Sequence, residues 1–226
     1  MTDQVSAQVS GISLDAYLGG CAHNRPTDDV ISFLSRRGQL PTEGSSSQEQ
    51  QDYLRLLARQ LHARWIGEIG FNAGISSLAF LGSNSCLKVI SFDIGYHQVV
   101  QHAKEFIDQH YMGRHELVIG DSKLTVPKYA REHPEISFDL VFIDGGHDLM
   151  TASADIANLR LLCNPGAGIV VDDLTPWLDW GAGPTAAWNE AVRQGLIVPI
   201  EMFKDGQRVH AIEPPGRKAW AFGLYR

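Results

Sequence analysis

The chain has 226 residues, 44% of them hydrophobic and 20% charged, which is the profile of an ordinary globular protein with one sizeable core. Its 19 basic and 26 acidic residues give a net charge of −7, which disfavours non-specific nucleic-acid binding and favours cationic ligands or metal ions. No apolar run reaches the ~20 residues of a membrane span and the N-terminus is too polar for a signal peptide, so we expect a cytoplasmic protein with no membrane partner.

The first 40 residues predict two short helices. One is capped by Ser13, and the second runs from about Pro26 to Gly38. We expect residues 1–40 to form a helical extension that serves as a lid or as a contact in a homodimer, and residues 41–226 to form the main domain. The polar stretch 41–48 predicts a loop, and the apolar periodicity of 48–62 predicts a helix.

From residue 64 onward, strands and helices alternate. Strands are predicted at 65–70, 87–93, 115–121, 138–144 and 167–173, and the helices between them at 74–82, 97–110, 123–132 and 149–162. This alternation predicts βαβ units and a parallel sheet that is buried on both faces. The fold class is therefore α/β, a Rossmann-like, doubly wound sheet with helices on both faces.

The last fifty residues predict a different arrangement. A tryptophan-containing loop leads into a helix at 186–194, and segments 196–203, 209–213 and 218–226 read as late strands with an Asp-Gly turn between the first two. We expect these strands to complete a mostly parallel sheet of seven strands with an antiparallel edge. Trp177 and Trp180 in the loop are candidates for substrate contact, and Trp188 in the helix is a candidate for the core.

Acidic residues follow the predicted parallel strands repeatedly. The residues concerned are Asp93, Asp121, Asp144, Asp172 and Asp173. Because right-handed crossovers bring the carboxyl ends of parallel strands to one edge, where ligands of such sheets bind, these carboxylates should share a site. Like charges at one place repel one another, so the repetition indicates function.

The turn after the first strand favours a nucleotide cofactor, although a purely structural turn remains open. Gly70 allows a tight turn, and Gly74 opens the next helix close to the sheet. A dinucleotide fingerprint needs a middle glycine, and Asn72 stands in its place. Glu68 also suits a cationic ligand better than a phosphate, which points to S-adenosylmethionine. Asp93 is then placed for ribose hydroxyls, and Asp121 with Ser122 for the adenine side.

The motifs E-I-G-x-N-x-G-x-S, F-I-D-G-G-H and V-V-D-D resemble class I S-adenosylmethionine-dependent methyltransferases over residues 41 to 195. Within them the chain is similar to the divalent-metal-dependent O-methyltransferases, including the catechol, caffeoyl-CoA and macrolide-sugar enzymes. The Asp172-Asp173 pair matches the sugar-type enzymes, because the catechol type usually has Asp-Asn. The resemblance implies that a loop at Thr42, Glu43 and Gly44 closes over the cofactor. It also places four residues at the methionine end: Glu68, Gly70, Asn72 and Ser76.

Three carboxylates at neighbouring strand ends need neutralisation. Asp144, Asp172 and Asp173 could be protonated or could cap the following segments, but a hard cation such as Mg²⁺ with oxygen ligands is simpler. A bound cation would lower the pKa of a substrate hydroxyl. His147, three residues after Asp144, is the candidate general base, although it could also be a surface residue at the start of a helix. The resembled enzymes place Lys or His at that position.

We therefore expect Mg²⁺-assisted methyl transfer from S-adenosylmethionine to a hydroxyl of a small molecule, a phenol, catechol or natural-product sugar. The alternatives are a metal-independent methyltransferase, which would use the acids structurally, and an NAD-dependent oxidoreductase. The sequence lacks zincin and G-x-S-x-G motifs. Cys21, Cys86 and Cys163 are scattered and odd in number, which argues against disulfides and fits a reducing compartment.

Overall fold

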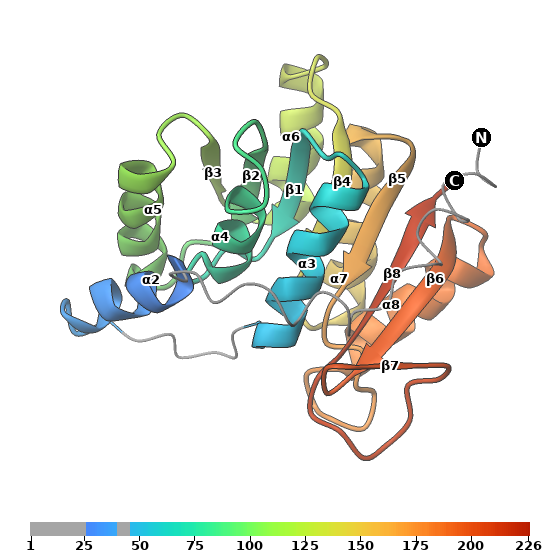
Figure 1. Ribbon diagram of the computed structural model, residues 1–226. Coiled ribbons are helices and arrows are strands. Elements are labelled where there is room, and N and C mark those ends of the chain that lie inside the picture. Colours follow the sequence, from blue (N-terminus) through green and yellow to red (C-terminus); the bar gives the residue numbers. More distant parts are fainter. Residues whose placement is uncertain (1–25, 40–45) are drawn as a thin grey trace.

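The central strands of the computed structural model are parallel, because a helix follows each strand and returns the chain to the starting edge (Figure 1). The model describes residues 26–39 and 46–226. The parallel strands are β1 (Trp65–Ile69), β2 (Lys88–Asp93), β3 (His115–Ile119), β4 (Phe138–Ile143) and β5 (Cys163–Val171). The three later strands are β6 (Ile197–Lys204), β7 (Gln207–Val209) and β8 (Ala219–Tyr225), and they pair antiparallel.

The strand order is β3-β2-β1-β4-β5-β8-β6-β7, so the direction of winding reverses between β1 and β4. At this switch point the connections from the two strands leave toward opposite faces and open a crevice at the carboxyl edge. The described residues thus confirm the Rossmann-like α/β fold with helices on both faces and an antiparallel edge.

Side chains along the buried strands point alternately to the two faces of the sheet, and each face has its own hydrophobic core. On β4, Leu140 and Phe142 belong to one core, whereas Val141 and Ile143 belong to the other. The first core is covered by α2 (Pro26–Ser35), α3 (Gln48–Gln60), α4 (Ile75–Leu81) and α5 (Gln98–His110). The second is covered by α6 (Ser122–Glu132), α7 (Leu149–Leu159) with the 3₁₀ turn η2 (Arg160–Leu162), and α8 (Ala182–Arg193).

The structure corrects several predicted details. The sheet of the described residues has eight strands rather than seven, because the Asp205-Gly206 turn lets the short β7 pair with β6. The strand predicted at 209–213 ends at Val209. β5 begins at Cys163, earlier than predicted, because Cys163 pairs with Phe138 before the register shifts. α8 begins at Ala182 instead of residue 186.

The predicted N-terminal extension is described only in part. The helix predicted near Ser13 and Cys21 lies outside the described residues. α2 packs against α4 and α5, and its Val30 and Leu34 are fully buried in the first core. Burying such side chains contributes roughly 1.5–3 kcal/mol each, so this helix stabilises the main fold. Within the ranges described, no helix has the length and apolar character needed to cross a membrane.

Candidate active site

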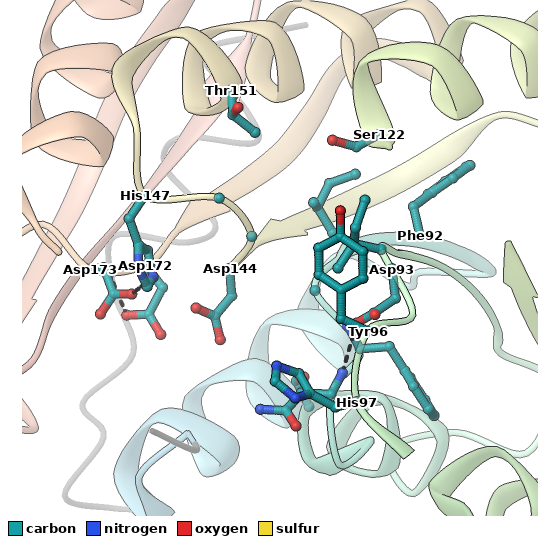
Figure 2. Close-up of a pocket in the computed structure, with 18 of the residues that line it drawn as sticks. Phe92, Asp93, Tyr96, His97, Ser122, Asp144, His147, Thr151, Asp172 and Asp173 are labelled. Carbon is teal, nitrogen blue, oxygen red and sulfur yellow. Dashed lines mark hydrogen bonds and ion pairs between the residues drawn. The ribbon is translucent and has the colours of Figure 1, made fainter. Parts of the chain in front are cut away.

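A cavity of about 920 Å³ opens at the carboxyl edge of the parallel strands. Its lining brings together most of the residues that the sequence predicts for the site: Gly70, Asn72, Ser76, Asp93, Asp121, Ser122, Asp144, His147, Asp172 and Asp173. Figure 2 shows Asp144, Asp172, Asp173 and His147 on one side and Asp93 with Tyr96 and His97 on the other. The cavity therefore has two halves. We call the half at β2 and β3 the nucleoside half, after the role predicted for Asp93, and the half at β4 and β5 the acid half.

The turn after β1 requires glycine at its first position. Gly70 has a φ of +87°, and a Cβ atom there would lie 1.8 Å from the carbonyl oxygen of Asp144. Asn72 also has a positive φ, 44°, and Gly74 begins α4 at a φ of +71°. This left-handed backbone is strained for residues with a side chain, and Asn tolerates it better than most. The turn thereby aims its N–H groups at the end of β2.

Asp93 holds that turn in place. Its Oδ2 accepts hydrogen bonds from the backbone N–H groups of Phe71 and Asn72 at 2.9 and 3.0 Å, and its Oδ1 accepts one from Gly95 at 2.7 Å. Each carboxylate oxygen has two acceptor sites, so one site on Oδ1 remains for a further donor such as a ribose hydroxyl. The observed role of Asp93 is structural, and its predicted contact with the ribose stays a prediction.

Asp121 and Ser122 stand at the start of α6. Asp121 is the N-cap, and its Oδ1 accepts a hydrogen bond from the N–H of Lys123 at 3.0 Å. Lys123 bridges outward from there, with its Nζ 3.5 Å from Asp121 Oδ2 and 3.2 Å from Thr151 Oγ1. Both predicted adenine-side residues line the nucleoside half.

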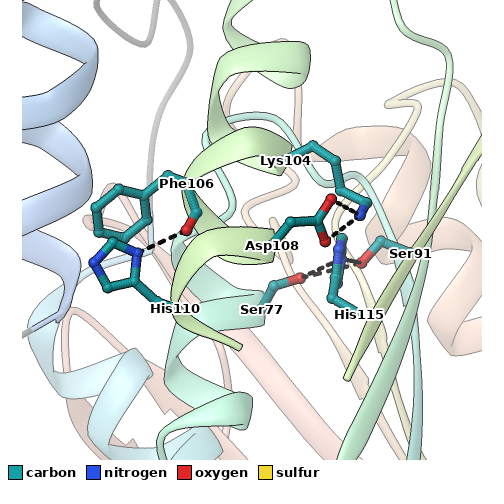
Figure 3. Close-up of polar contacts among 7 residues, drawn as sticks. All are labelled: Ser77, Ser91, Lys104, Phe106, Asp108, His110 and His115. Carbon is teal, nitrogen blue, oxygen red and sulfur yellow. Dashed lines mark hydrogen bonds and ion pairs between the residues drawn. The ribbon is translucent and has the colours of Figure 1, made fainter. Parts of the chain in front are cut away.

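Glu68 does not line the cavity, contrary to the prediction that it binds cofactor directly. It is fully buried, and its Oε2 accepts hydrogen bonds from the hydroxyls of Ser77 and Ser91. Ser91 Oγ also lies 3.0 Å from Nε2 of His115, and Figure 3 shows this contact. The His115 ring stacks on Phe71 of the glycine turn. Glu68 points into the sheet because side chains alternate along β1, so it supports the turn from behind.

Burial is the largest influence on the pKa values of Glu68 and His115. It raises the pKa of Glu68 to about 7, although hydrogen bonds from Ser76, Ser77 and Ser91 favour the charged form. It lowers the pKa of His115 to about 3, so that imidazole is neutral at physiological pH. The Glu68 Oε1 and His115 Nδ1 atoms are buried without a hydrogen-bond partner in the described structure.

The acid half crowds three carboxylates together. Burial, followed by the charges of Asp172 and Asp173, raises the pKa of Asp144 well above its ordinary value. Burial and Asp173 raise the pKa of Asp172 to about 6, whereas Gln50, the backbone N–H of Asp173 and Lys218 oppose the rise. Among the residues that the structure describes, no three His, Cys, Asp or Glu side chains are grouped so that they could hold one metal ion.

His147 and Asp173 form a pair at the cavity. The Nε2 of His147 lies 3.0 Å from Oδ2 of Asp173. Asp173 has a φ of 58°, a conformation that is uncommon for a residue with a side chain and typical of functional sites. Asp148, next in sequence, caps α7 by accepting a hydrogen bond from the N–H of Thr151 at 2.9 Å, so His147 is released from a capping role. The pair has the form of a base and its orienting group.

Several residues at this site were missed by the sequence reasoning. Tyr96, His97, Arg217 and Lys218 line the cavity from loops whose positions no local pattern predicts. Asp155 on α7 is fully buried, and burial raises the pKa of its carboxyl to about 6. A hydrogen bond with Ser122 opposes this rise. The available signal was its position about two turns into α7, where it is the one charged side chain of the helix. Thr42, Glu43 and Gly44, the predicted cofactor loop, lie outside the described residues.

The tryptophans divide differently from the prediction. Trp180 lines the cavity and is 37% exposed, as expected for a substrate contact. Trp177 instead donates a hydrogen bond from Nε1 to the carbonyl oxygen of Gly216 at 2.9 Å, so its observed contact is structural. Trp188 is buried in the second core, as predicted.

Residues 68–174 match a family model described as "Methyltransferase domain". This range begins at Glu68 and ends just beyond Asp173, so it includes the glycine turn and the acid half of the cavity. No curated protein matches the sequence significantly.

Three solved structures are similar over nearly the whole chain. The cofactor-bound Rv0187 from MTB is 26% identical, with 94% of this chain and 96% of that chain covered and a TM-score of 0.70. The O-methyltransferase TomG from Streptomyces achromogenes, in complex with SAM, is 18% identical over 94% and 95%, with a TM-score of 0.72. The O-methyltransferase from Bacillus cereus, in complex with SAH, is 17% identical over all of both chains, with a TM-score of 0.71.

Substitution of Gly70 by Ala should destabilise the fold strongly. The new Cβ would clash with the Asp144 carbonyl, so β1 and β4 must shift in addition to the cost of the positive φ, which alone is roughly 1–2 kcal/mol. Gly113→Ala is the matched control, because Gly113 has a φ of +70° with no atom within 4 Å of its Cβ position. Urea unfolding measures both. Equal losses of stability would show that the close approach is unimportant.

The free energy of unfolding should fall as pH rises through 7, and Glu68→Gln should remove part of that fall. A folded-state pKa raised from 4.5 to about 7 stabilises the protein fully below pH 4.5, and this stabilisation is lost as pH rises through 7. The component is on the order of 3 kcal/mol, at 1.36 kcal/mol per pKa unit. Denaturant melts from pH 5 to pH 8 measure it, with Glu132→Gln at the exposed end of α6 as control. Parallel profiles for wild type and Glu68→Gln would contradict the assignment.

Proposed function

We propose that the protein transfers a methyl group from S-adenosylmethionine to a hydroxyl of a small molecule, starting from the match of residues 68–174 to the methyltransferase domain model. The observation that carries the proposal is the two-part cavity. Asp93 and the glycine turn lie at one end, and the His147–Asp173 pair lies at the other. A dinucleotide oxidoreductase is set aside, because Asn72 occupies the place of its middle glycine.

The nucleoside half suits S-adenosylmethionine. Gly70 leaves the backbone open to close approach, Ser76 lines the same wall, and Asp93 retains one acceptor site, on Oδ1, for a ribose hydroxyl. The half presents carboxylates rather than a phosphate-binding cradle, which fits a ligand that carries a sulfonium and an amine but no phosphate. The SAM and SAH complexes of the similar structures support this choice of cofactor.

The cofactor supplies a methyl group on sulfonium sulfur, and the hydroxyl oxygen forms the new bond to that carbon while the carbon–sulfur bond breaks. The chain's own contribution is to position the acceptor and to remove its proton. His147 takes the hydroxyl proton as general base, and Asp173 orients the imidazole and stabilises its charged form. Placing the two reactants in line contributes much of the rate, because the reaction becomes effectively unimolecular.

We also propose that a divalent cation, Mg²⁺ in the simplest case, assists at Asp144, Asp172 and Asp173. Oxygen ligands suit a hard cation. Burial and then the charges of Asp172 and Asp173 raise the pKa of Asp144, and a bound cation would offset both effects. Because these side chains are not grouped as a metal site in the described structure, we assign no step of the transfer to the cation.

Metal-independent transfer is the second candidate, and one contact favours it. Asp173 faces His147 at 3.0 Å, which is the arrangement of a base with its orienting carboxylate. In that case Asp144 and Asp172 would remain partly protonated, as their raised pKa values allow. Both candidates give the same products.

Excess EDTA should abolish methyl transfer while the affinity for S-adenosylmethionine changes less than threefold. A cation held by Asp144, Asp172 and Asp173 would lie in the acid half of the cavity, away from Asp93, so its removal would affect transfer and leave cofactor binding nearly unchanged. The measurements are transfer to a panel of phenol and sugar acceptors and calorimetric cofactor binding, with restoration by added Mg²⁺ as control. Full activity in EDTA would exclude the proposed role of the cation and favour metal-independent transfer.

His147→Ala should lower kcat by about 10²–10⁴-fold, the usual contribution of a general base, with cofactor affinity preserved. The pH profile of kcat should lose its rising limb, because no imidazole remains to be deprotonated. His102→Ala on the exposed side of α5 is the matched control. If cofactor affinity and kcat fall together, His147 has a structural role.

A further inference from the structure

One wall of the cavity lies beyond β5, on the far side of the acids from the nucleoside half. Trp180 comes from the loop between β5 and α8, and Arg217 and Lys218 immediately precede β8. β8 pairs directly with β5, and the N–H of Leu174 donates to the carbonyl of Ala219 at 2.8 Å. The position of this wall, next to His147 and Asp173 but away from Asp93, is where an acceptor molecule must enter if the proposed function holds.

The wall is held in shape by polar contacts. Asp205 Oδ1 accepts hydrogen bonds from the backbone N–H groups of Arg217 and Lys218 at 2.9 and 3.1 Å. The Trp177 indole donates to Gly216, which ties the tryptophan loop to the same segment. A wall fixed before binding costs little ordering entropy when a ligand arrives.

The two basic side chains differ in what they face. The Lys218 ammonium lowers the pKa of both Asp144 and Asp172, so its charge already acts on the acid half. Arg217 is exposed, and within the described residues its only recorded hydrogen bond is made by its backbone N–H. A guanidinium is a planar fork that pairs with a carboxylate through two parallel hydrogen bonds. The partly exposed Trp180 offers the same space a large apolar face.

We propose that the acceptor carries a carboxylate on its hydroxyl-bearing ring, with the carboxylate paired to Arg217 and the ring packed on Trp180. This rests on the proposed function, because the acceptor is defined by methyl transfer. Arg217 is then a specificity-determining residue, and Trp180 contributes ring packing that is independent of charge. The acid half bonds the hydroxyl end, while the basic wall selects the other end of the same molecule.

The test compares two matched probes, 3,4-dihydroxybenzoate and its methyl ester, which differ by one charge. For the wild-type enzyme we expect a KM for the acid about tenfold below that for the ester, and a preference that shrinks with added NaCl. Arg217→Ala should raise the KM for the acid about tenfold and change the ester less than twofold, and Arg217→Lys should retain part of the preference. Arg208→Ala is the control, because Arg208 pairs with Glu201 on β6 and does not line the cavity.

The outcomes separate this inference from the function on which it rests. Methylation of both probes with equal KM, or an equal rise for both in Arg217→Ala, overturns the carboxylate site and leaves methyl transfer standing. If neither probe is methylated although S-adenosylmethionine binds, calorimetry with each probe decides: acid binding that Arg217→Ala weakens supports the site, and equal or absent binding overturns it. Absence of cofactor binding would overturn the proposed function itself.

Discussion

The approach of Gly70 to the carbonyl of Asp144 ties the two halves of the cavity together. With 1.8 Å between that oxygen and a Cβ position, the turn after β1 rests directly on the end of β4. The same turn donates its N–H groups to Asp93, and the residue that presents the carbonyl begins the segment that leads to His147. The backbone at the point where the sheet reverses its winding therefore sets the separation between Asp93 and His147.

Buried carboxylates lie near this contact, and burying their charge lowers the stability of the folded protein. Glu68, Asp155 and Asp172 each have a raised pKa because burial disfavours charge. Glu68 is compensated by two serine hydroxyls, whereas Asp172 accepts the backbone N–H of Asp173. A core designed for stability alone would replace these groups with apolar ones. Groups with shifted pKa values that gather near one cavity are typical of functional sites.

The sequence predicted the parallel part of the fold well, because apolar runs and the acids that follow them can be recognised locally. The parallel topology then brings these acids to one edge of the sheet. Asp93, Asp121, Asp144 and Asp172 could be placed at one edge from chain order alone. The side on which Glu68 falls depends on pleat parity at the strand end, and a shift of one residue reverses it. Arg217 could not be placed, because its loop is positioned by β8 pairing with β5 from about fifty residues away and by the carboxylate of Asp205.

The antiparallel unit of β6, β7 and β8 stands outside the doubly wound strands and carries the wall with Arg217. Asp205 accepts hydrogen bonds from the backbone N–H groups of Arg217 and Lys218, and the Trp177 indole donates to the same segment. If the proposed function holds, remodelling this one hairpin would change the choice of acceptor and leave the Asp93 turn in place.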